Sequence, residues 1–289
     1  MTIALLFPGQ GSEEPEMGLA LASADARAAR LLALASDACA VDVRRAIERG
    51  GRAMTRTEVI QPAIVAVSLA VARALEDRGL VIDCVLGHSL GELTAACFAL
   101  DVPDEDAIAI AASRGRAMAE AAATSPGGML ACATTPSTPG LVLAAHNAPD
   151  EHVLSGRHDA LVAAERALAP HARRLAVAGA WHSRAMEPAT APLRAALGAM
   201  NGRAPRTTLI SALDAREVVD GARAADVLVR GIVSPVRWVD ALRAARHRGV
   251  SEMIVVAPAR VVRSLARRTL GPSFPVRAVA TPEDIESAK

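Results

Sequence analysis

The feature that most constrains this chain is the pentapeptide GHSLG at residues 87–91, which lies between a predicted strand and a predicted helix. An apolar run over residues 82–86 precedes it, and a helical pattern from Gly91 to about Leu100 follows it. A serine flanked by glycines in this context is typical of a nucleophile elbow, a sharp turn that exposes the hydroxyl. The N–H groups that open the helix can stabilise a negative charge beside it. The pattern predicts a nucleophilic Ser89; the alternative is a glycine-rich turn with a solvent-facing serine.

The first 125 residues repeat the order of strand, turn and helix. Residues 3–7 form a short apolar run typical of a buried strand. Residues 61–78 are apolar at helical spacing, and Gln61-Pro62 indicates that this helix begins there, because proline is tolerated in a first turn. A further helix is predicted over residues 104–122. This order predicts an α/β fold with a largely parallel sheet.

The pattern changes after Ser125. Short strands are predicted over residues 129–133, 140–144, 152–154 and 174–177, with a helix over 160–168. We therefore expect a small α+β subdomain of residues 126–187, inserted into a large core of residues 1–125 and 188–289. In the second part of the core, helices are expected over residues 188–200, 236–248 and 261–268, and strands over 207–210 and 252–256.

A nucleophilic serine needs a base within hydrogen-bond reach. His182 is the best candidate, because it stands at the end of the insertion and directly before a predicted helix. His88 adjoins Ser89, and we expect its side chain to point away from the cleft. The remaining histidines lie in polar or arginine-rich surroundings and are expected to be exposed: His146, His152, His158, His171 and His247.

Seven motifs occur in the order found in one known family. They are FPGQGS at residues 7–12, Gln61-Pro62-Ala63, GHSLGE at 87–92, Arg114-Gly115 with Met118, Asn147-Ala148-Pro149 with Ser155-Gly156, Trp181-His182-Ser183, and Pro235-Val236-Arg237-Trp238. Over essentially its whole length the chain resembles the malonyl-CoA:acyl-carrier-protein transacylases and the acyltransferase domains of polyketide synthases. The expected fold is then an α/β hydrolase-like core with a largely parallel sheet and an inserted, ferredoxin-like α+β subdomain.

The resemblance implies a ping-pong reaction. Ser89 would attack the thioester of malonyl-CoA while His182 takes its proton, and the phosphopantetheine thiol of an acyl carrier protein would then accept the acyl group. In the family, backbone N–H groups at the positions of Gln10 and Leu90 hold the oxyanion. A backbone carbonyl orients the histidine, and at its position this chain has Gly231 where relatives often have glutamine.

The resemblance also implies a substrate-binding set. Arg114 matches the arginine that holds the free carboxylate of malonate, which a guanidinium can grip with two hydrogen bonds. The alternative is a solvated helix arginine, since 31 of the 32 basic residues are arginines. Trp181 is expected to narrow the space for an α-substituent and so to favour malonyl. Gln61, Met118 and Asn147 are expected to line the cleft, with ordinary packing as their alternative.

Three other functions fit part of the sequence. The fold would also suit an acyl hydrolase that releases stalled acyl groups from carrier proteins. A non-catalytic module that binds carrier proteins is a second alternative. A general esterase would explain the GHSLG pentapeptide but not the FPGQGS element.

The charge and the apolar pattern of the sequence limit the partners and the cellular location that we expect. The 32 basic and 31 acidic residues leave a net charge of +1, which gives no reason to expect nucleic acid or an anionic membrane as a partner. No stretch of about 20 uninterrupted apolar residues suggests a membrane span, and we do not expect the N-terminal residues to form a secretion signal. We expect a cytoplasmic monomer of a fatty-acid or polyketide pathway, without a bound cofactor or metal, whose partners are malonyl-CoA and an acyl carrier protein.

Overall fold

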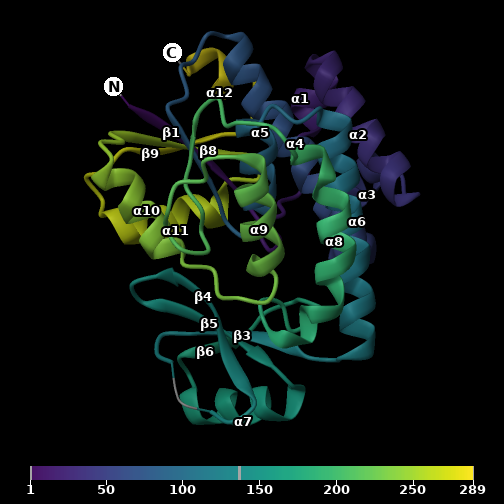
Figure 1. Ribbon diagram of the computed structural model, residues 1–289, viewed down its shortest axis with the longest axis vertical. Helices are drawn as coiled ribbons and strands as arrows, with labels where there is room; N and C mark the ends of the chain where they lie inside the picture. Colours follow the sequence, from purple (N-terminus) through teal and green to yellow (C-terminus); the bar gives the residue numbers. More distant parts are fainter. Residues whose placement is uncertain (1, 136–137, 289) are drawn as a thin grey trace.

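The computed structural model describes residues 2–135 and 138–288. Its main part is a parallel five-stranded sheet with the strand order β7-β2-β1-β8-β9 (Figure 1). These strands are β1 (Ile3–Phe7), β2 (Cys84–Gly87), β7 (Thr208–Leu209), β8 (Glu252–Val256) and β9 (Val276–Val279). β1, β2 and β8 are almost continuously apolar, as expected of parallel strands covered on both faces.

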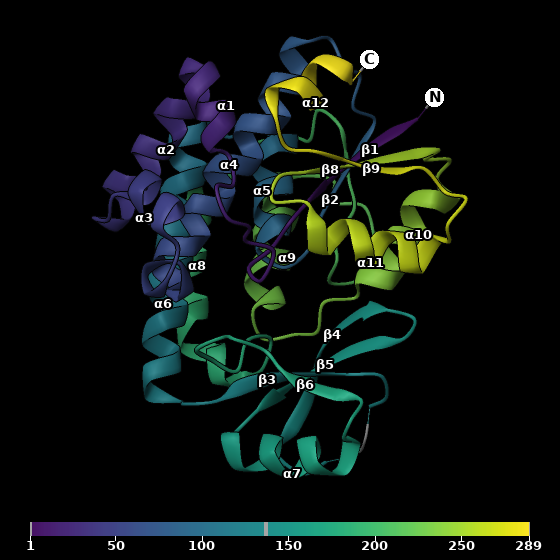
Figure 2. The ribbon, with the colours of Figure 1, turned by 180° about the vertical axis from the view of Figure 1, so that it is seen from behind.

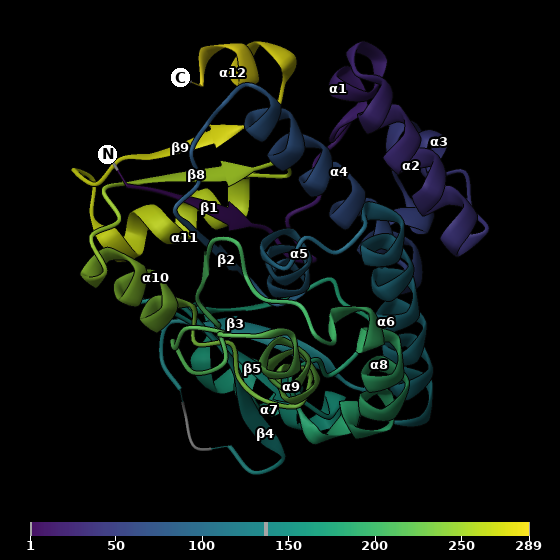
Figure 3. The ribbon, with the colours of Figure 1, turned by 45° about the horizontal axis from the view of Figure 1, so that its top comes forward.

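Helices cover this sheet. α4 and α11 lie on opposite faces of the strands β1, β8 and β9 (Figure 3). The helices of the main part are α1 (Leu19–Ala24), α2 (Ala26–Cys39), α3 (Val43–Arg49), α4 (Thr57–Asp77), α5 (Leu90–Ala99), α6 (Asp104–Thr124), α8 (Thr190–Ala196), α9 (Gly221–Gly231), α10 (Trp238–His247), α11 (Arg260–Leu270) and α12 (Pro282–Ser287), with short 3₁₀ turns η1 (Arg52–Thr55), η2 (Arg184–Ala189) and η3 (Leu197–Met200).

A second, antiparallel sheet forms the lower part of the molecule in Figure 1. Its strands, in the order β4-β5-β3-β6, are β3 (Gly128–Cys132), β4 (Leu141–Ala148), β5 (Glu151–Gly156) and β6 (Ala172–Arg174). Helix α7 (His158–Leu168) packs on it through a small apolar cluster of Leu130, Leu161 and Ala164. All of these elements fall inside residues 126–187, and the expected α/β fold with a small inserted sheet is confirmed.

The segment that begins at Pro235 joins the two parts. Val236 N donates to Ala144 O at 2.9 Å, and His146 N donates to Val236 O at the same distance. Val236 thus extends the antiparallel sheet next to β4, and helix α10 begins only at Trp238. The prediction of a helix from residue 236 was wrong at this end because the backbone of Val236 is committed to the sheet.

Several element boundaries differ from the sequence prediction. α4 begins four residues before Gln61, so that Pro62 lies inside it, and β6 ends where the strand over 174–177 was expected to begin. The helix expected over 188–200 is broken into η2, α8 and η3, in a stretch that contains Pro188 and Pro192. Helices α1 to α3, α9 and α12 and strand β9 were not predicted.

One helix has the length and hydropathy of a membrane span, which the sequence analysis did not anticipate. α4 contains an 18-residue window with a mean hydropathy of 1.6. Because 83% of that window is buried within the protein, α4 has the character of a core helix, and it packs against α2 and α6.

Candidate active site

Ser89 stands on the sharp turn between β2 and α5. Its backbone has φ 53° and ψ −107°, a left-handed conformation that non-glycine residues rarely adopt. A Cβ atom on Gly87 would overlap the backbone of Gly91, and one on Gly91 would overlap the carbonyl oxygen of Phe7. The two glycines therefore let the turn close and let the end of β1 approach it, as the nucleophile-elbow interpretation requires.

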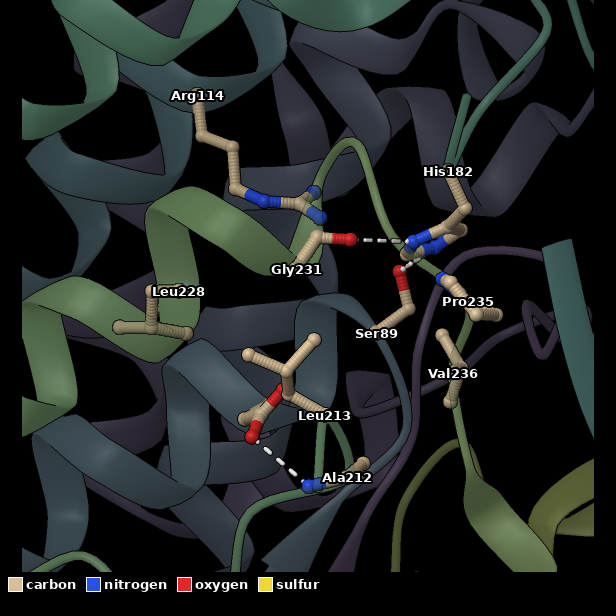
Figure 4. A pocket seen from close by; sticks show the side chains of 10 residues that line it. Ser89, Arg114, His182, Ala212, Leu213, Leu228, Gly231, Pro235 and Val236 are labelled. Carbon is tan, nitrogen blue, oxygen red and sulfur yellow. Dashed lines mark hydrogen bonds between the residues drawn. The ribbon is translucent and has the colours of Figure 1, made fainter. Parts of the chain in front are cut away.

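His182 reaches Ser89 from the segment that leaves the inserted sheet. Its Nε2 lies 2.8 Å from Ser89 Oγ, and its Nδ1 lies 2.7 Å from Gly231 O and 3.1 Å from Ser234 O (Figure 4). Carbonyl oxygens only accept hydrogen bonds, so Nδ1 carries the proton. Nε2 is then left with a lone pair that accepts the proton of the Ser89 hydroxyl.

Burial, together with the nearby positive charge of Arg114, lowers the pKa of His182 to about 4. The carbonyls of Gly231 and Ser234 act in the opposite direction but do not outweigh the burial. The imidazole is therefore neutral at physiological pH, which is the state that a general base needs.

Arg114 lies on α6 with only 5% of its surface exposed, and it faces Ser89 and His182 across a small pocket (Figure 4). Its Nη1 donates to Gln61 Oε1 at 2.7 Å. Among the residues that the structure describes, no carboxylate lies within salt-bridge distance of its guanidinium. Burial lowers its pKa to about 10, so the group remains charged. The Glu92 carboxyl in the same pocket attracts this cation without forming a salt bridge with it. A buried cation that lacks a salt bridge can bind an anionic group.

Gln61 does not line the cleft as expected. It is completely buried behind Arg114, where its Nε2 donates to Thr57 Oγ1 at 2.8 Å and contacts Met118 Sδ at 3.5 Å. Its amide is thus fixed with the oxygen toward Arg114. Gln61 positions the guanidinium from behind.

Glu92 is a buried carboxyl that the sequence analysis did not single out. It lines the small pocket with Arg114, accepts from Ser211 Oγ at 2.6 Å and accepts from Ala212 N at 2.9 Å. Burial raises its pKa to about 7. The sequence did contain a signal for this residue. Glu92 follows Ser89 by three residues in the GHSLGE motif, one turn into a buried helix, and a buried carboxyl needs a hydrogen-bond or charged partner.

A larger cavity of about 300 Å³ opens from the Ser89–His182 pair. It is lined by residues predicted for the site, namely Gln10, Leu90, Arg114, Met118, Asn147 and Trp181, and by α11 residues that were not. Trp181 is 5% exposed, and its Nε1 has no hydrogen-bond partner in the described part of the chain. Within that part, no three His, Cys, Asp or Glu side chains are grouped so as to hold a metal ion.

The expectation for His88 was wrong. Its side chain lines the cavity, its Nε2 lies 2.8 Å from Asn147 Oδ1, and its ring meets Trp238 edge-on at 5.5 Å. Asn147 in turn donates to Glu151 Oε1 at 3.1 Å. Two other histidines expected to be exposed, His146 and His152, are half-buried and stack on each other at 4.6 Å.

Gln10 and Leu90 come together because β1 and β2 are neighbours in the sheet. Leu90 is the first residue of α5, whose first N–H groups have no acceptor within the helix. Gln10 follows Gly9, where a Cβ would overlap the carbonyl oxygen of His88, and its own side chain accepts from Thr57 Oγ1 at 2.9 Å. Their role as oxyanion donors stays a prediction.

Fold and site together are those of an acyl-transfer enzyme. The site contains a serine on a sharp turn, a neutral histidine held by backbone carbonyls, and a buried cation that faces both. The sequence matches the acyl transferase domain family over residues 4–282. The chain belongs to this family.

Relatives of the whole chain agree with this assignment. A malonyl CoA-acyl carrier protein transacylase of Mycobacterium bovis is 35% identical over 98% of both chains. The crystal structure of a malonyl-CoA:ACP transacylase from Synechocystis sp. PCC 6803 superposes with a TM-score of 0.90 at 28% identity, over 99% of this chain and 100% of that one. A malonyl-transacylase in complex with a type II polyketide acyl-carrier protein has a TM-score of 0.89 at 26% identity, over 100% and 99% of the two chains.

Proposed function

We propose that this protein transfers a malonyl group from malonyl-CoA to the phosphopantetheine thiol of an acyl carrier protein, through an ester on Ser89. The observation that carries the proposal is the buried Arg114, which forms no salt bridge in the described part of the chain, in the pocket that holds Ser89 and His182. Malonyl-CoA has a free carboxylate that such a cation would bind, whereas acetyl-CoA has none. The transacylase names of the full-length relatives support the same substrate.

In the first half-reaction, Ser89 Oγ attacks the thioester carbonyl carbon while His182 Nε2 takes the hydroxyl proton. The tetrahedral intermediate collapses with cleavage of the carbon–sulfur bond, and the departing CoA sulfur receives that proton from Nε2. Nδ1 stays bonded to Gly231 O throughout, so the ring keeps its orientation when it is briefly charged. The products are CoA and malonyl-Ser89.

In the second half-reaction, the carrier thiol gives its proton to the same Nε2 and its sulfur attacks the ester carbonyl carbon. The carbon–oxygen bond to Ser89 then breaks, and Oγ recovers the proton from His182. The backbone N–H groups of Gln10 and Leu90 are the proposed oxyanion donors. Removal of one such donor typically raises the barrier by about 2.7–4 kcal/mol.

Three further statements belong to the proposal. Trp181, which lines the cavity beside His182, restricts an α-substituent on the acyl group. The reaction uses only side chains and backbone of this chain, without a resident cofactor. The protein works as a soluble cytoplasmic enzyme of fatty-acid or polyketide synthesis.

A transfer assay tests the proposal. The protein is incubated with radiolabelled malonyl-CoA and a holo acyl carrier protein, and label on the carrier is separated from free malonate. We expect label on the carrier, dependent on both Ser89 and His182. Release of free malonate in place of transfer would favour the acyl hydrolase alternative, and carrier binding without any acyl-Ser89 would favour the non-catalytic alternative.

A further inference from the structure

Helix α11 presents different chemistry on two of its sides. Val261, Val262 and Leu265 line the catalytic cavity. Arg260, Arg263 and Arg267, which follow one another at three- and four-residue spacing, line a neighbouring surface groove of about 600 Å³. One helix therefore forms both the wall of the cavity and a row of cations beside it. We call these three residues the α11 arginine row.

The arginine row is not neutralised within the protein. None of the three has a carboxylate partner in the described part of the chain, and Arg263 donates only to the backbone oxygen of Val276, at 3.3 Å. Glu14, a carboxylate that lines the same groove, accepts from the backbone N of Arg260 at 2.8 Å. Arg260 and Arg267 are exposed. The groove thus carries free positive charge.

The place of the row beside the catalytic cavity distinguishes it, because other arginines, such as Arg45 and Arg49, also have no carboxylate partner in the described part of the chain. Some arginines do meet carboxylates: Arg73 pairs with Glu76 and Asp104, and Arg223 pairs with Asp226 and Asp214. On α11 itself, the neighbouring Arg268 is paired with Asp150 at 2.6 Å and Glu151 at 2.8 Å. Along α11, the three arginines of the row thus have no carboxylate partner, while their neighbour Arg268 has two.

The pairing of Arg268 also fixes where the row lies. Asp150 lies in the turn between β4 and β5, and Glu151 is the first residue of β5, so this pairing ties α11 to the inserted sheet. Figure 2 shows α11 directly above β4 and β5. A partner seated on the row would face the junction of the two parts, beside the cavity that holds Ser89 and His182.

We propose that the α11 arginine row is the docking surface for an acidic carrier protein. This inference rests on the proposed function, because a carrier must deliver its pantetheine arm into the cavity that α11 lines. From Arg260 to Arg267 the row rises about 10 Å along the helix, longer than a single phosphate group and suited to a row of carboxylates on a partner helix. Exposed charges of this kind mainly speed association and are screened by salt.

The test compares two double variants with the same change of charge. Arg260→Glu/Arg267→Glu alters the first and last turns of α11. Arg45→Glu/Arg49→Glu makes the same change in the first and last turns of α3, on the far side of the molecule (Figure 2). Acylation of Ser89 by malonyl-CoA is followed by intact mass, and transfer is measured to a holo acyl carrier protein and to free pantetheine, at low and high salt.

We expect malonyl-CoA to acylate the α11 variant, and the variant to transfer malonyl to pantetheine, at the wild-type rate. Its kcat/KM for the carrier should fall at least tenfold at low salt, and this difference should shrink at high salt. The α3 variant should match the wild type. A carrier kcat/KM equal in the α11 and α3 variants would overturn the proposal. If the rate at which malonyl-CoA acylates Ser89 fell in the α11 variant as much as the transfer to the carrier, this would also overturn the proposal and would indicate that the groove binds the phosphates of CoA. Absence of acylation in the wild type would instead refute the proposed function.

Discussion

Arg114 Nη1 donates a 2.7 Å hydrogen bond to the amide oxygen of Gln61, a neutral partner, although both side chains are buried. A carboxylate in place of this amide would neutralise the guanidinium and leave it little attraction for an anion. The amide orients the cation and keeps its charge free. In the proposed reaction, Gln61 would therefore act on the substrate through Arg114.

The first prediction concerns Gln61 as a positioning residue. Gln61→Leu should lower kcat/KM for malonyl-CoA about tenfold, a loss that corresponds to ~1.4 kcal/mol for one hydrogen bond to a charged group. The kcat/KM for acetyl-CoA, which has no carboxylate to position, should not change. The control is Ser68→Ala, which removes another buried polar contact of α4, the bond to Ala257 O. Equal losses with both substrates would mean that Gln61 only stabilises the fold.

The second prediction concerns the charge of Arg114. Arg114→Met should lower kcat/KM for malonyl-CoA by about 10- to 100-fold, in line with ~1.5–3 kcal/mol for charged hydrogen bonds. The preference for malonyl-CoA over acetyl-CoA should shrink by a similar factor. Arg116→Met is the matched control, because Arg116 lies on the same helix, is exposed and donates to Ala38 O. A retained malonyl preference in Arg114→Met would contradict the carboxylate role.

The third prediction follows from the low pKa of His182. The neutral imidazole is the active form, and a pKa of about 4 keeps it neutral throughout the physiological range. The rate at which phenylmethylsulfonyl fluoride modifies Ser89 should therefore be flat from about pH 6 to 8 and fall as the pH approaches 4. This reagent has no titrating group that would confuse the profile. A midpoint of this profile near pH 6.5 or above would show that burial does not determine the pKa of His182.

The fourth prediction concerns Glu92. Its pKa is raised from 4.5 to about 7, so between these values the folded state holds a proton that the unfolded state releases. Its contribution to stability therefore falls as the pH rises through this window. Glu92→Gln keeps an oxygen for Ser211 and Ala212 without the charge. The difference between the urea unfolding midpoints of the variant and the wild type should therefore increase in favour of the variant from pH 5 to pH 8. A difference that does not change with pH would contradict this prediction.

The sequence alone predicted the parts of the site that depend on local chain geometry. The elbow follows from two glycines around Ser89, because only residues without a Cβ fit where the backbones of Gly91 and Phe7 come so close. His182 was predicted from its position at the end of the insertion, and the alternation of strand and helix was enough for the parallel sheet.

What the sequence could not give were contacts made across the fold. The bond between Gln61 and Arg114 joins residues 53 positions apart, and Asn147 meets His88 over 59 positions. Neither pairing has a periodic signal. Helix α9 was not recognised either, yet its last residue, Gly231, supplies the carbonyl that holds His182. The proposed docking surface could not be predicted for another reason, since arginines occur throughout the chain and only the structure shows which of them lie together beside the cavity.

The most direct test of the whole account is intact-mass analysis after brief exposure to an equal mixture of malonyl-CoA and acetyl-CoA. The wild type should carry one malonyl group and almost no acetyl group, Ser89→Ala should carry neither, and Arg114→Met should lose the preference. A wild type that remains unmodified, or that takes up both acyl groups equally, would contradict the claim that Ser89, His182 and Arg114 form one site for a carboxylated acyl group.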